Sequence, residues 1–295
     1  MSARAPSPIA APDRADIEAE VRRALAEDIR DGDVTAALLP DGPEIAYLLC
    51  KEDAVIAGRP WFDAAHRALH PQVEIDWRIE EGTRVAAGTV IATLAGRRRA
   101  LVSAERTALN FLQTLSGTAT TTARYVAAVA GTGARILDTR KTLPGLRLAQ
   151  KYAVRVGGGH NHRIGLFDAV MLKENHIRAF GTLAAAIATA RARHPDLPLI
   201  VEVETLAQLR EALEAGCTRI LIDDFDDATR RQAVRIAREE FAGRIPLEVS
   251  GGIDLSGVRA IADDGVDCIS IGGLTKHVQA IDLSMKLGPP PSTPS

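Results

Sequence analysis

The stretch RILDTRKTLPGLRLAQKYAVRVGGGHNHRIGLFDAVMLK, residues 135–173, decides the fold. It holds eight basic residues and two acidic ones, in a chain of 295 residues with a formal net charge of −2. Short apolar runs at 136–137 and 169–172 border it, and charged residues follow each run. We interpret the runs as buried strands and the charged residues as part of an active site. Such a basic stretch in a nearly neutral protein favours a small polyanionic ligand over nucleic acid, because nucleic-acid-binding domains are usually basic throughout.

The composition is that of an ordinary globular protein. Hydrophobic residues make up 46% and charged residues 25%, which is enough apolar material for one large domain or two ordinary ones. Cys50, Cys217 and Cys268 lie far apart, a pattern that indicates a reducing compartment rather than a disulfide framework or a zinc site. The sequence starts without a secretory signal pattern and has no apolar run of membrane-spanning length. We therefore expect a cytoplasmic protein that binds no membrane.

The N-terminal part of the chain has the pattern of a mixed α/β domain with an antiparallel sheet. Strands are expected at 44–50, 53–57 and 73–79, and in a glycine-punctuated hairpin over 80–96. Helices are expected where apolar residues recur at helical spacing, from residue 13, over 61–69 and over 103–115. Ser103 would cap the third helix, and Ser116 with Gly117 would break it before another helix that ends near residue 130.

Beyond this point strands and helices alternate. The strand candidates are 135–138, 169–172, 199–203, 219–222, 247–250 and 268–271. The helical patterns are 146–156, 182–193, 205–215, 227–241, 255–264 and 275–286. This alternation predicts a parallel sheet that closes, wholly or in part, into a barrel. Because complete barrels have eight strands, we expect an incomplete parallel α/β barrel of about six strands, with an open doubly wound sheet as the weaker alternative.

These patterns divide the chain into two domains and two tails. Residues 13–116 would form the N-terminal domain, and residues 117–287 the barrel. The last helix of the chain is free to pack back on the N-terminal domain. The proline-rich segments 1–12 and 288–295 are expected to be disordered tails.

Polar, charged or glycine residues follow all six strand candidates. In chain order they include Asp138, Arg140, Lys141, Lys173, Glu202, Glu204, Asp223, Asp224, Ser250, Gly251, Gly252, Gly272 and Gly273. The carboxyl ends of barrel strands open onto one common mouth, so we expect these residues to share a site. One such residue alone often serves only as a helix cap, but the complete set indicates a functional site.

The last two strand ends have the composition of phosphate-binding loops. Ser250 and Gly251 follow one strand, Gly272 and Gly273 follow the other, and a helix is expected after each. Unpaired backbone N–H groups and helix dipoles would then converge on a phosphate. Turn glycines explain either loop equally well when it is taken alone, whereas the two together favour phosphate binding. Lys276 would add positive charge.

Glu202 and Asp223 are the candidate acidic pair. Glu202 and Glu204 share one face of their strand, and a carboxylate inside a barrel is costly unless it meets a metal or a cation. With Asp223 on the next strand, Glu202 is suited to bind Mg²⁺ or ribose hydroxyls. Asp224 and Asp226 are better explained as residues of a helix start.

His160, His162 and Lys173 leave several roles open. A histidine metal pair, as in barrel amidohydrolases, would need further histidines at later strand ends, and the sequence has none there. We therefore favour hydrogen bonding to a ligand for His162 and a solvated loop position for His160. Lys173 is suited either to a Schiff base, as in barrel aldolases, or to binding a multiply charged anion in its protonated form.

Several long motifs resemble one known family. They are ERTALNFLQTLSGTAT (105–120), DTRKTLPGLR (138–147), KYAVRVGGGHNHRIGLFD (151–168), MLKENH (171–176), VEVE (201–204), SGGI (250–253) and GGLTKH (272–277). These segments are similar to quinolinate phosphoribosyltransferase, also called carboxylating nicotinate-nucleotide pyrophosphorylase, over nearly the whole chain. The resemblance implies an N-terminal α/β domain, an incomplete barrel and a homodimer with sites at the subunit interface. Higher assemblies occur in some members.

The resemblance also implies a reaction and its residues. Quinolinate and phosphoribosyl pyrophosphate would give nicotinate mononucleotide, pyrophosphate and CO₂, with Mg²⁺ as the cofactor. The quinolinate carboxylates would be held by Arg140, His162, Arg163 and Lys173, with Arg106 from the neighbouring subunit. The phosphoribosyl donor would contact Lys141, Glu202, Asp223, Ser250, Gly251, Gly272, Gly273 and Lys276. Spacing alone favours a solvated surface position for Arg106, and the resemblance instead implies a role in the partner's site.

Two positions depart from the family pattern. Asparagine often follows the acid at the position of Asp223, where this chain has Asp224, and a small residue such as alanine often stands at the position of Gly273. The change at Asp224 adds a negative charge near the phosphates, and the change at Gly273 is expected to be neutral. The alternatives are a pyrophosphorylase of the same fold with another acceptor, a Schiff-base lyase and a non-catalytic homologue.

Overall fold

The structure is a computed structural model that describes residues 9–291, so of the predicted tails 1–12 and 288–295 only residues 1–8 and 292–295 lie outside it. Its contacts group the chain into two compact units. The first runs to Ala123 and takes in Leu143–Gly158 and everything from His277 on; the second comprises Arg124–Thr142 and Gly159–Lys276. The division at 116 and 117 stays a prediction, although these units assign two later segments to the first one.

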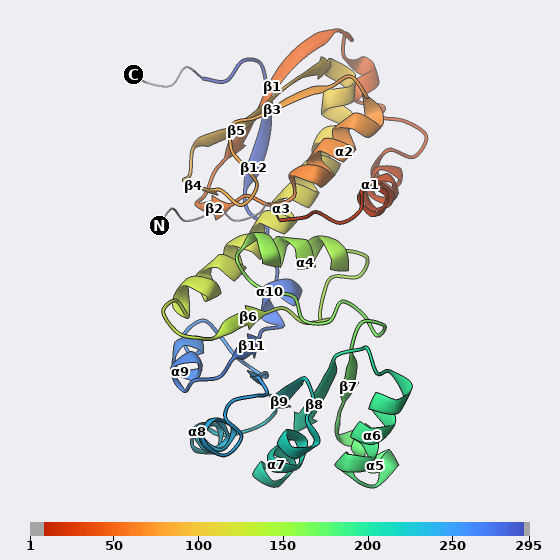
Figure 1. Cartoon of the computed structure of the whole chain (residues 1–295). Coiled ribbons are helices and arrows are strands. Elements are labelled where there is room, and N and C mark those ends of the chain that lie inside the picture. Colours follow the sequence, from red (N-terminus) through yellow and green to blue (C-terminus); the bar gives the residue numbers. More distant parts are fainter. Residues whose placement is uncertain (1–8, 292–295) are drawn as a thin grey trace, which may run out of the picture. The chain divides into compact units, whose positions relative to one another are not determined.

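The first unit contains a four-stranded antiparallel sheet, as predicted (Figure 1). The strand order is β12-β1-β5-β3, with β1 at Pro43–Cys50, β3 at Glu74–Trp77, β5 at Thr89–Arg97 and β12 at Leu283–Leu287. A two-stranded ribbon joins β2 (Ala54–Val55) to β4 (Arg84–Val85). The sheet and the helices share one core that includes Trp61, Phe62, Leu94 and Leu112, all of them almost completely buried.

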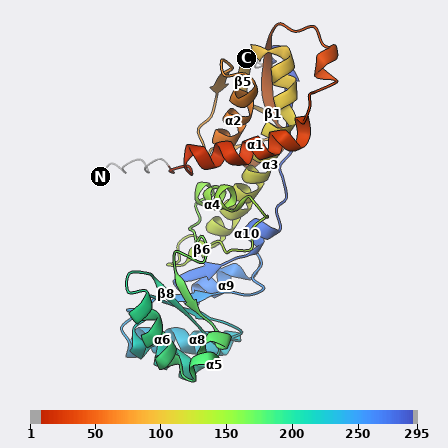
Figure 2. The ribbon, with the colours of Figure 1, turned by 90° about the vertical axis from the view of Figure 1, so that its right-hand side faces the viewer.

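Four helices, one of them only in part, complete this unit. They are α1 (Arg14–Ile29), α2 (Arg59–Leu69), most of α3 (Arg98–Ala128) and α4 (Arg147–Val156), and a short 3₁₀ turn lies at Ala36–Leu38. Helix α1 packs against α2, and Figure 2 shows it from the side. The indole N–H of Trp61 on α2 donates to Glu20 on α1 at 2.7 Å, which satisfies a polar group inside the contact between the helices.

The last segment of the chain is a strand, so the predicted helix over 275–286 is wrong. Only α10, Gly273–Lys276, is helical there, and β12 pairs with β1. Ile281, Leu283 and Met285 are buried while the residues between them are more exposed. This alternation has the period of a strand, and the prediction mistook it for a helical face.

Helix α3 runs unbroken over Arg98–Ala128, so the predicted break at Ser116 and Gly117 is also wrong. The Ser116 hydroxyl accepts from the Ala57 N–H at 2.9 Å and donates to its carbonyl at 3.1 Å. A Cβ at Gly117 would overlap the carbonyl oxygen of Gln279, so this glycine permits a close backbone approach. Ser103 lies inside the helix and donates to Asp33 at 2.8 Å instead of capping it.

His66 should make the first unit sensitive to acid. It is 1% exposed on α2, and burial lowers its pKa from 6.5 to about 4. The unfolded chain therefore takes up a proton that the folded chain excludes, and stability is lost as the pH falls from about 6.5 to about 4. Because one pKa unit corresponds to about 1.4 kcal/mol, we expect this group to cost about 2 kcal/mol at pH 5.

Urea unfolding at pH 7 and pH 5, followed by tryptophan fluorescence, measures this cost. Both tryptophans, Trp61 and Trp77, belong to the first unit and report on it alone. His66→Leu should remove the extra loss at pH 5, whereas His194→Leu, at an exposed position of the second unit, should keep it. An equal loss of stability in wild type and His66→Leu would contradict the prediction.

The second unit is an incomplete parallel α/β barrel, as predicted. Its strands are β6 (Arg135–Leu137), β7 (Val170–Leu172), β8 (Leu199–Val203), β9 (Arg219–Ile222), β10 (Leu247–Val249) and β11 (Cys268–Ser270). The order β6-β11-β10-β9-β8-β7 places consecutive strands side by side and leaves the sheet open between β6 and β7. A doubly wound sheet would reverse its order at a switch point, so that alternative does not fit.

Helices follow the barrel strands as predicted, with one addition (Figure 1). They are α6 (Leu183–Arg193), α7 (Leu206–Ala215), α8 (Asp227–Arg235) with a π-helical continuation at Ile236–Glu240, and α9 (Val258–Asp263). The additional helix is α5, Glu174–Phe180, directly after Lys173. No helix in the described part of the chain is long and apolar enough to cross a bilayer.

The parallel strands divide their residues between two faces. Val201, Ile220, Leu247 and Ile269 alternate onto one face and are fully buried. The other face carries a row in which Glu202, Leu221, Glu248, Cys268 and Arg135 are successive register partners. The polar residues of this row lie on the face where Asp223 continues β9, so this face carries the site.

Candidate functional site

The strand order brings the predicted site residues to one edge of the second unit. From β6 to β7, the carboxyl ends carry Arg140 and Lys141, then Gly272 and Gly273, Ser250 and Gly251, Asp223, Glu202 and finally Lys173. The two glycine loops thus lie between Lys141 and Asp223. This order places possible phosphate contacts between a cation and an acid.

Asp138 joins the end of β6 to the segment that carries His162. Its side chain is fully buried and accepts from the His162 N–H at 2.8 Å and from Asn161 Nδ2 at 2.6 Å. The backbone of His160 pairs with β6 in parallel, through hydrogen bonds to Ile136 and Asp138. These four hydrogen bonds fix residues 160–162 beside β6, and the first two satisfy a carboxylate that would otherwise be costly to bury.

Residues 160–169 span the opening between the two edge strands. The segment starts beside β6 and ends at Ala169, whose carbonyl accepts from Arg163 Nη1 at 3.4 Å just before β7 begins. Asp168 accepts from the N–H groups of Ile164 and Gly165 at 2.7 and 3.0 Å, which tightens the turn. The segment that carries Arg163 is therefore fixed at both ends, beside β6 and before β7, and holds Arg163 over the opening of the barrel.

Arg163 and Arg140 lie close enough for their positive charges to repel. Burial, and next the Arg140 guanidinium, lower the pKa of Arg163, while Asp168 acts in the opposite direction. Two guanidinium groups drawn together are unfavourable by themselves and become favourable when an anion binds between them. The pair predicts an anion site with at least one carboxylate or phosphate.

Lys173 and Glu202 form an ion pair at the other end of the sheet. Lys173 Nζ lies 2.5 Å from Glu202 Oε2, and the side chain of Glu202 is only 10% exposed. An ion pair requires the protonated amine, whereas a Schiff base requires the neutral one, so the geometry favours charge binding by Lys173. Asp223 extends β9 on the same face, next to the glycine loop, with an oxygen 3.8 Å from a Cβ built on Gly251.

The two glycine loops differ from the predicted strand–loop–helix arrangement. After Ser250, helix α9 begins only at Val258, and α10 has four residues. Helix dipoles therefore contribute little, and any phosphate contact must come from loop N–H groups. Gly251 has φ +101°, a conformation that side-chain-bearing residues rarely adopt, so a glycine is needed there.

The acids that follow β9 have different structural roles. Asp226 caps α8 by accepting from the Thr229 N–H at 2.7 Å, as predicted for a helix start. Asp224 lies before the helix with φ +57° and is exposed, so its predicted role in the helix start is wrong. Asparagine and aspartate are the non-glycine residues that tolerate this left-handed conformation best.

The sequence interpretation missed two charged residues beneath the site. Glu248 is fully buried on β10, with its Oε2 3.0 Å from Arg219 Nη1 of β9 and its Oε1 3.4 Å from His162 Nε2. A glutamate between Leu247 and Val249 in an apolar strand was the available signal, because charged residues are rarely buried without a function or a partner.

Arg106 belongs to the first unit and is exposed on α3. It lines a hollow of about 310 Å³ together with Asn110, Phe111, Glu27 and Asp28. All the other predicted site residues belong to the second unit. The structure therefore places Arg106 in the first unit and all the other predicted site residues in the second.

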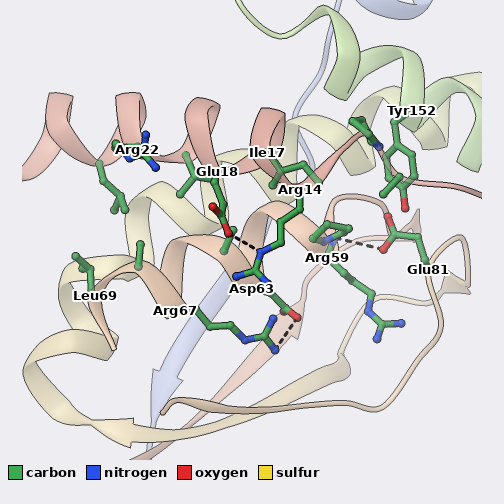
Figure 3. Close-up of a pocket in the computed structure, with 17 residues that line it drawn as sticks. Arg14, Ile17, Glu18, Arg22, Arg59, Asp63, Arg67, Leu69, Glu81 and Tyr152 are labelled. Atoms are coloured by element: carbon green, nitrogen blue, oxygen red, sulfur yellow. Dashed lines mark hydrogen bonds and ion pairs between the residues drawn. The ribbon is translucent and has the colours of Figure 1, made fainter. Parts of the chain in front are cut away.

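A larger cavity of the first unit contains none of the predicted residues. It measures about 1040 Å³ and lies between α1, α2 and Tyr152 (Figure 3). Two of its four arginines pair within it, Arg14 with Glu18 at 2.6 Å and Arg67 with Asp63 at 3.2 Å, and Glu81 adds a third acid. Because these charges are neutralised locally, the cavity lacks the cationic excess that the second unit offers.

The fold and the site define an incomplete α/β barrel with cationic, acidic and glycine residues gathered at the carboxyl edge of its parallel sheet. The family model described as "Quinolinate phosphoribosyl transferase, C-terminal domain" matches residues 118–286, and the model of the corresponding N-terminal domain matches residues 33–116. The chain belongs to the quinolinate phosphoribosyltransferase family.

Individual relatives agree over most of the chain. A nicotinate-nucleotide pyrophosphorylase [carboxylating] of Mycobacterium leprae is 42% identical over 90% of this chain and 95% of its own. A solved nicotinate-nucleotide pyrophosphorylase from Francisella tularensis is 42% identical with a TM-score of 0.90, covering 96% of this chain and 99% of that one. The corresponding structure from Ehrlichia chaffeensis is 32% identical with a TM-score of 0.85, covering 91% and 97%.

Gly272 should control the placement of Lys141. A Cβ at Gly272 would lie 3.0 Å from Lys141 Cδ and 3.5 Å from the Thr139 hydroxyl, so Gly272→Ala must displace the lysine stem. If Lys141 binds a phosphate, we expect Gly272→Ala to weaken inorganic pyrophosphate binding about tenfold, or about 1.4 kcal/mol. Titration calorimetry measures the change.

Gly133→Ala is the matched control, because a Cβ there meets nothing within 4 Å. It should bind pyrophosphate like the wild type. Equal pyrophosphate binding by wild type and Gly272→Ala, with both proteins folded, would show that Lys141 does not bind the phosphate.

Proposed function

We propose that this protein transfers the phosphoribosyl group from phosphoribosyl pyrophosphate to quinolinate and releases pyrophosphate and CO₂. The product is nicotinate mononucleotide, in the de novo synthesis of NAD. The match to the quinolinate phosphoribosyltransferase family over residues 33–116 and 118–286 carries this proposal. The cations Arg140 and Arg163, which lie near each other at the carboxyl edge of the barrel, suit the anionic substrates of that reaction.

Quinolinate fits the cationic end of the site. Its two adjacent carboxylates would be bound by Arg140, Arg163 and Lys173, with His162 beside them. Guanidinium forks bind carboxylates in a bidentate way and therefore fix the orientation of the ring. That orientation would direct the pyridine nitrogen at the anomeric carbon of the donor, which removes much of the entropic barrier.

The donor fits the opposite part of the edge. Lys141, Lys276 and the loops at Ser250, Gly251, Gly272 and Gly273 would bind its phosphates. As pyrophosphate leaves, positive charge builds up on the ribose, and Glu202 and Asp223 would stabilise that charge. The N-ribosylated ring then accepts the electrons of the departing 2-carboxylate as an ylide, so CO₂ leaves without a redox cofactor.

The acids at this edge are suited to Mg²⁺. The described residues contain no cluster of three or more ligands that would hold a metal by themselves. One or two carboxylates together with substrate phosphates is the usual protein environment of Mg²⁺, so Glu202 and Asp223 fit an ion that arrives with the donor. The ion would supply charge neutralisation on the pyrophosphate.

Glu202 has to exchange partners when the substrates bind. In the structure it neutralises Lys173 at 2.5 Å. A quinolinate carboxylate would take over Lys173, and the ribose or the ion would take over Glu202. The pair thus keeps two charges balanced until both substrates replace it.

We also propose a cytoplasmic homodimer in which Arg106 of each subunit reaches the partner's site. Arg106 is an exposed cation in a different unit from the other quinolinate ligands. The hollow that it lines would accept part of the second subunit. The second carboxylate of quinolinate would gain a cation from this arrangement.

Release of CO₂ from quinolinate labelled at its 2-carboxylate tests the reaction. Wild-type protein with phosphoribosyl pyrophosphate and Mg²⁺ should release the label, and Arg163→Gln should lower kcat/KM by about tenfold or more. Arg178→Gln, at an exposed position on α5, should keep the activity. Consumption of the donor with another ring acid but not with quinolinate would point to a related pyrophosphorylase with a different acceptor.

Mixing two inactive variants tests the shared site. Arg106→Ala and Lys141→Ala remove groups from opposite partners of one site, so a mixed dimer regains one intact site of two. We expect each variant alone to be nearly inactive and the mixture to recover up to about a quarter of the wild-type rate, since half of the dimers are mixed. Absence of recovery, with subunit exchange confirmed by mass spectrometry, would place Arg106 outside the partner's site.

A further inference from the structure

Glu248 is a buried carboxylate with an incomplete set of partners. It is 0% exposed, and its Oε2 accepts from Arg219 Nη1 at 3.0 Å. Its Oε1 has no hydrogen bond of standard geometry to any described residue, and it lies 3.4 Å from His162 Nε2. A buried carboxylate oxygen without a donor is costly, so the nearby ring N–H matters for the stability of this arrangement.

The other ring nitrogen of His162 shows where its proton is. His162 Nδ1 accepts from the Arg163 N–H at 2.8 Å, which is possible only when Nδ1 carries no hydrogen. The ring is therefore neutral, and its single hydrogen is on Nε2. Glu248 Oε1 lies 3.4 Å from this nitrogen, short of hydrogen-bond geometry, and is the carboxylate oxygen that still needs a donor.

One nitrogen of His162 is thus used by the protein itself, and the other lies beside a buried carboxylate. The ring is 8% exposed and links Glu248 on one side to the backbone of Arg163 on the other. In this geometry His162 offers no further N–H to a substrate. Its contribution to an anion site must pass through Arg163, the residue whose N–H it accepts.

We propose that Glu248 is a positioning residue that holds His162 in the Nε2–H tautomer and thereby fixes Arg163. Arg219 orients the carboxylate, the carboxylate accepts from the ring, and the ring accepts from the backbone of Arg163. The chain of contacts runs from β9 through β10 to the segment over the barrel opening. Its effect on catalysis rests on the proposed function, whereas the tautomer can be measured without any turnover.

Glutamine cannot replace Glu248 in this chain of contacts. If its carbonyl oxygen faces His162, its NH₂ group faces the Arg219 guanidinium, which also carries only donors. If its NH₂ group faces the ring, Nε2 must lose its hydrogen and Nδ1 must gain one, which then opposes the Arg163 N–H. Either orientation breaks one link, so Glu248→Gln is a nearly isosteric test.

Two-bond ¹H–¹⁵N correlation of histidine side chains reads the tautomer directly. At pH 8, with the signal assigned by its loss in His162→Asn, wild-type His162 should show a protonated Nε2 and an unprotonated Nδ1. Glu248→Gln should lose this pattern or mix it with the other tautomer. A wild-type ring protonated on Nδ1 or on both nitrogens would overturn the proposal, whatever the variant does.

Kinetics and quinolinate binding supply the second measurement. Glu248→Gln should raise the quinolinate KM and Kd about tenfold through the misplaced Arg163, and leave kcat at saturating quinolinate within about twofold. Asp264→Asn is the matched control, because Asp264 forms a partly buried ion pair with Arg230 at 2.6 Å, away from the site. It should destabilise the protein without changing the quinolinate KM or the His162 tautomer.

The outcomes separate the two proposals. An unchanged tautomer and an unchanged quinolinate Kd in Glu248→Gln would overturn the role of Glu248. If Glu248→Gln fails to fold, the tautomer of His162 in the wild type still tests the proposed role of Glu248. A wild type that shows the expected tautomer but never releases CO₂ would refute the proposed reaction and leave the positioning of Arg163 intact.

Discussion

The buried carboxylate of Asp138 is the interaction on which the rest of the site depends. It accepts from the His162 N–H and from the Asn161 side chain, and so ties residues 160–162 to the end of β6. Without this tie, the segment over the open side of the barrel would have no fixed starting point. Arg163 could then not be held near Arg140, because the like charges repel. One desolvated acid thus compensates for an arrangement of cations that is unfavourable by itself.

The incomplete barrel explains why these cations can gather at all. A closed barrel would fill the space between β6 and β7 with further strands and helices. Here the two edge strands stay apart, and residues 160–169 cross the opening and hold Arg163 there. The remaining strands supply acids and glycines in an order that separates the two cationic ends. The opening is therefore a functional part of the site.

Most of the barrel could be predicted because its strands are apolar runs followed by polar groups. The errors have physical causes. Ser116 and Gly117 resemble a helix break, but tertiary contacts to Ala57 and Gln279 override their local preference. The last strand was interpreted as a helix because its alternation covers few residues. Glu248 was not predicted as a site residue because only the folded structure shows that Arg219 and His162 lie next to it.

The left-handed backbone at Asp224 also determines what evolution can do at this position. A residue directly after Asp223 must turn the chain sharply before α8, and φ +57° restricts it in practice to glycine, asparagine or aspartate. Exchange between the amide and the acid therefore leaves the direction of the polypeptide unchanged and alters only the local electrostatic potential. A valine or isoleucine here would force the backbone into another conformation and would displace the carboxylate of Asp223. Relatives should consequently carry only residues that tolerate this backbone conformation here, whereas the charge of the side chain can vary.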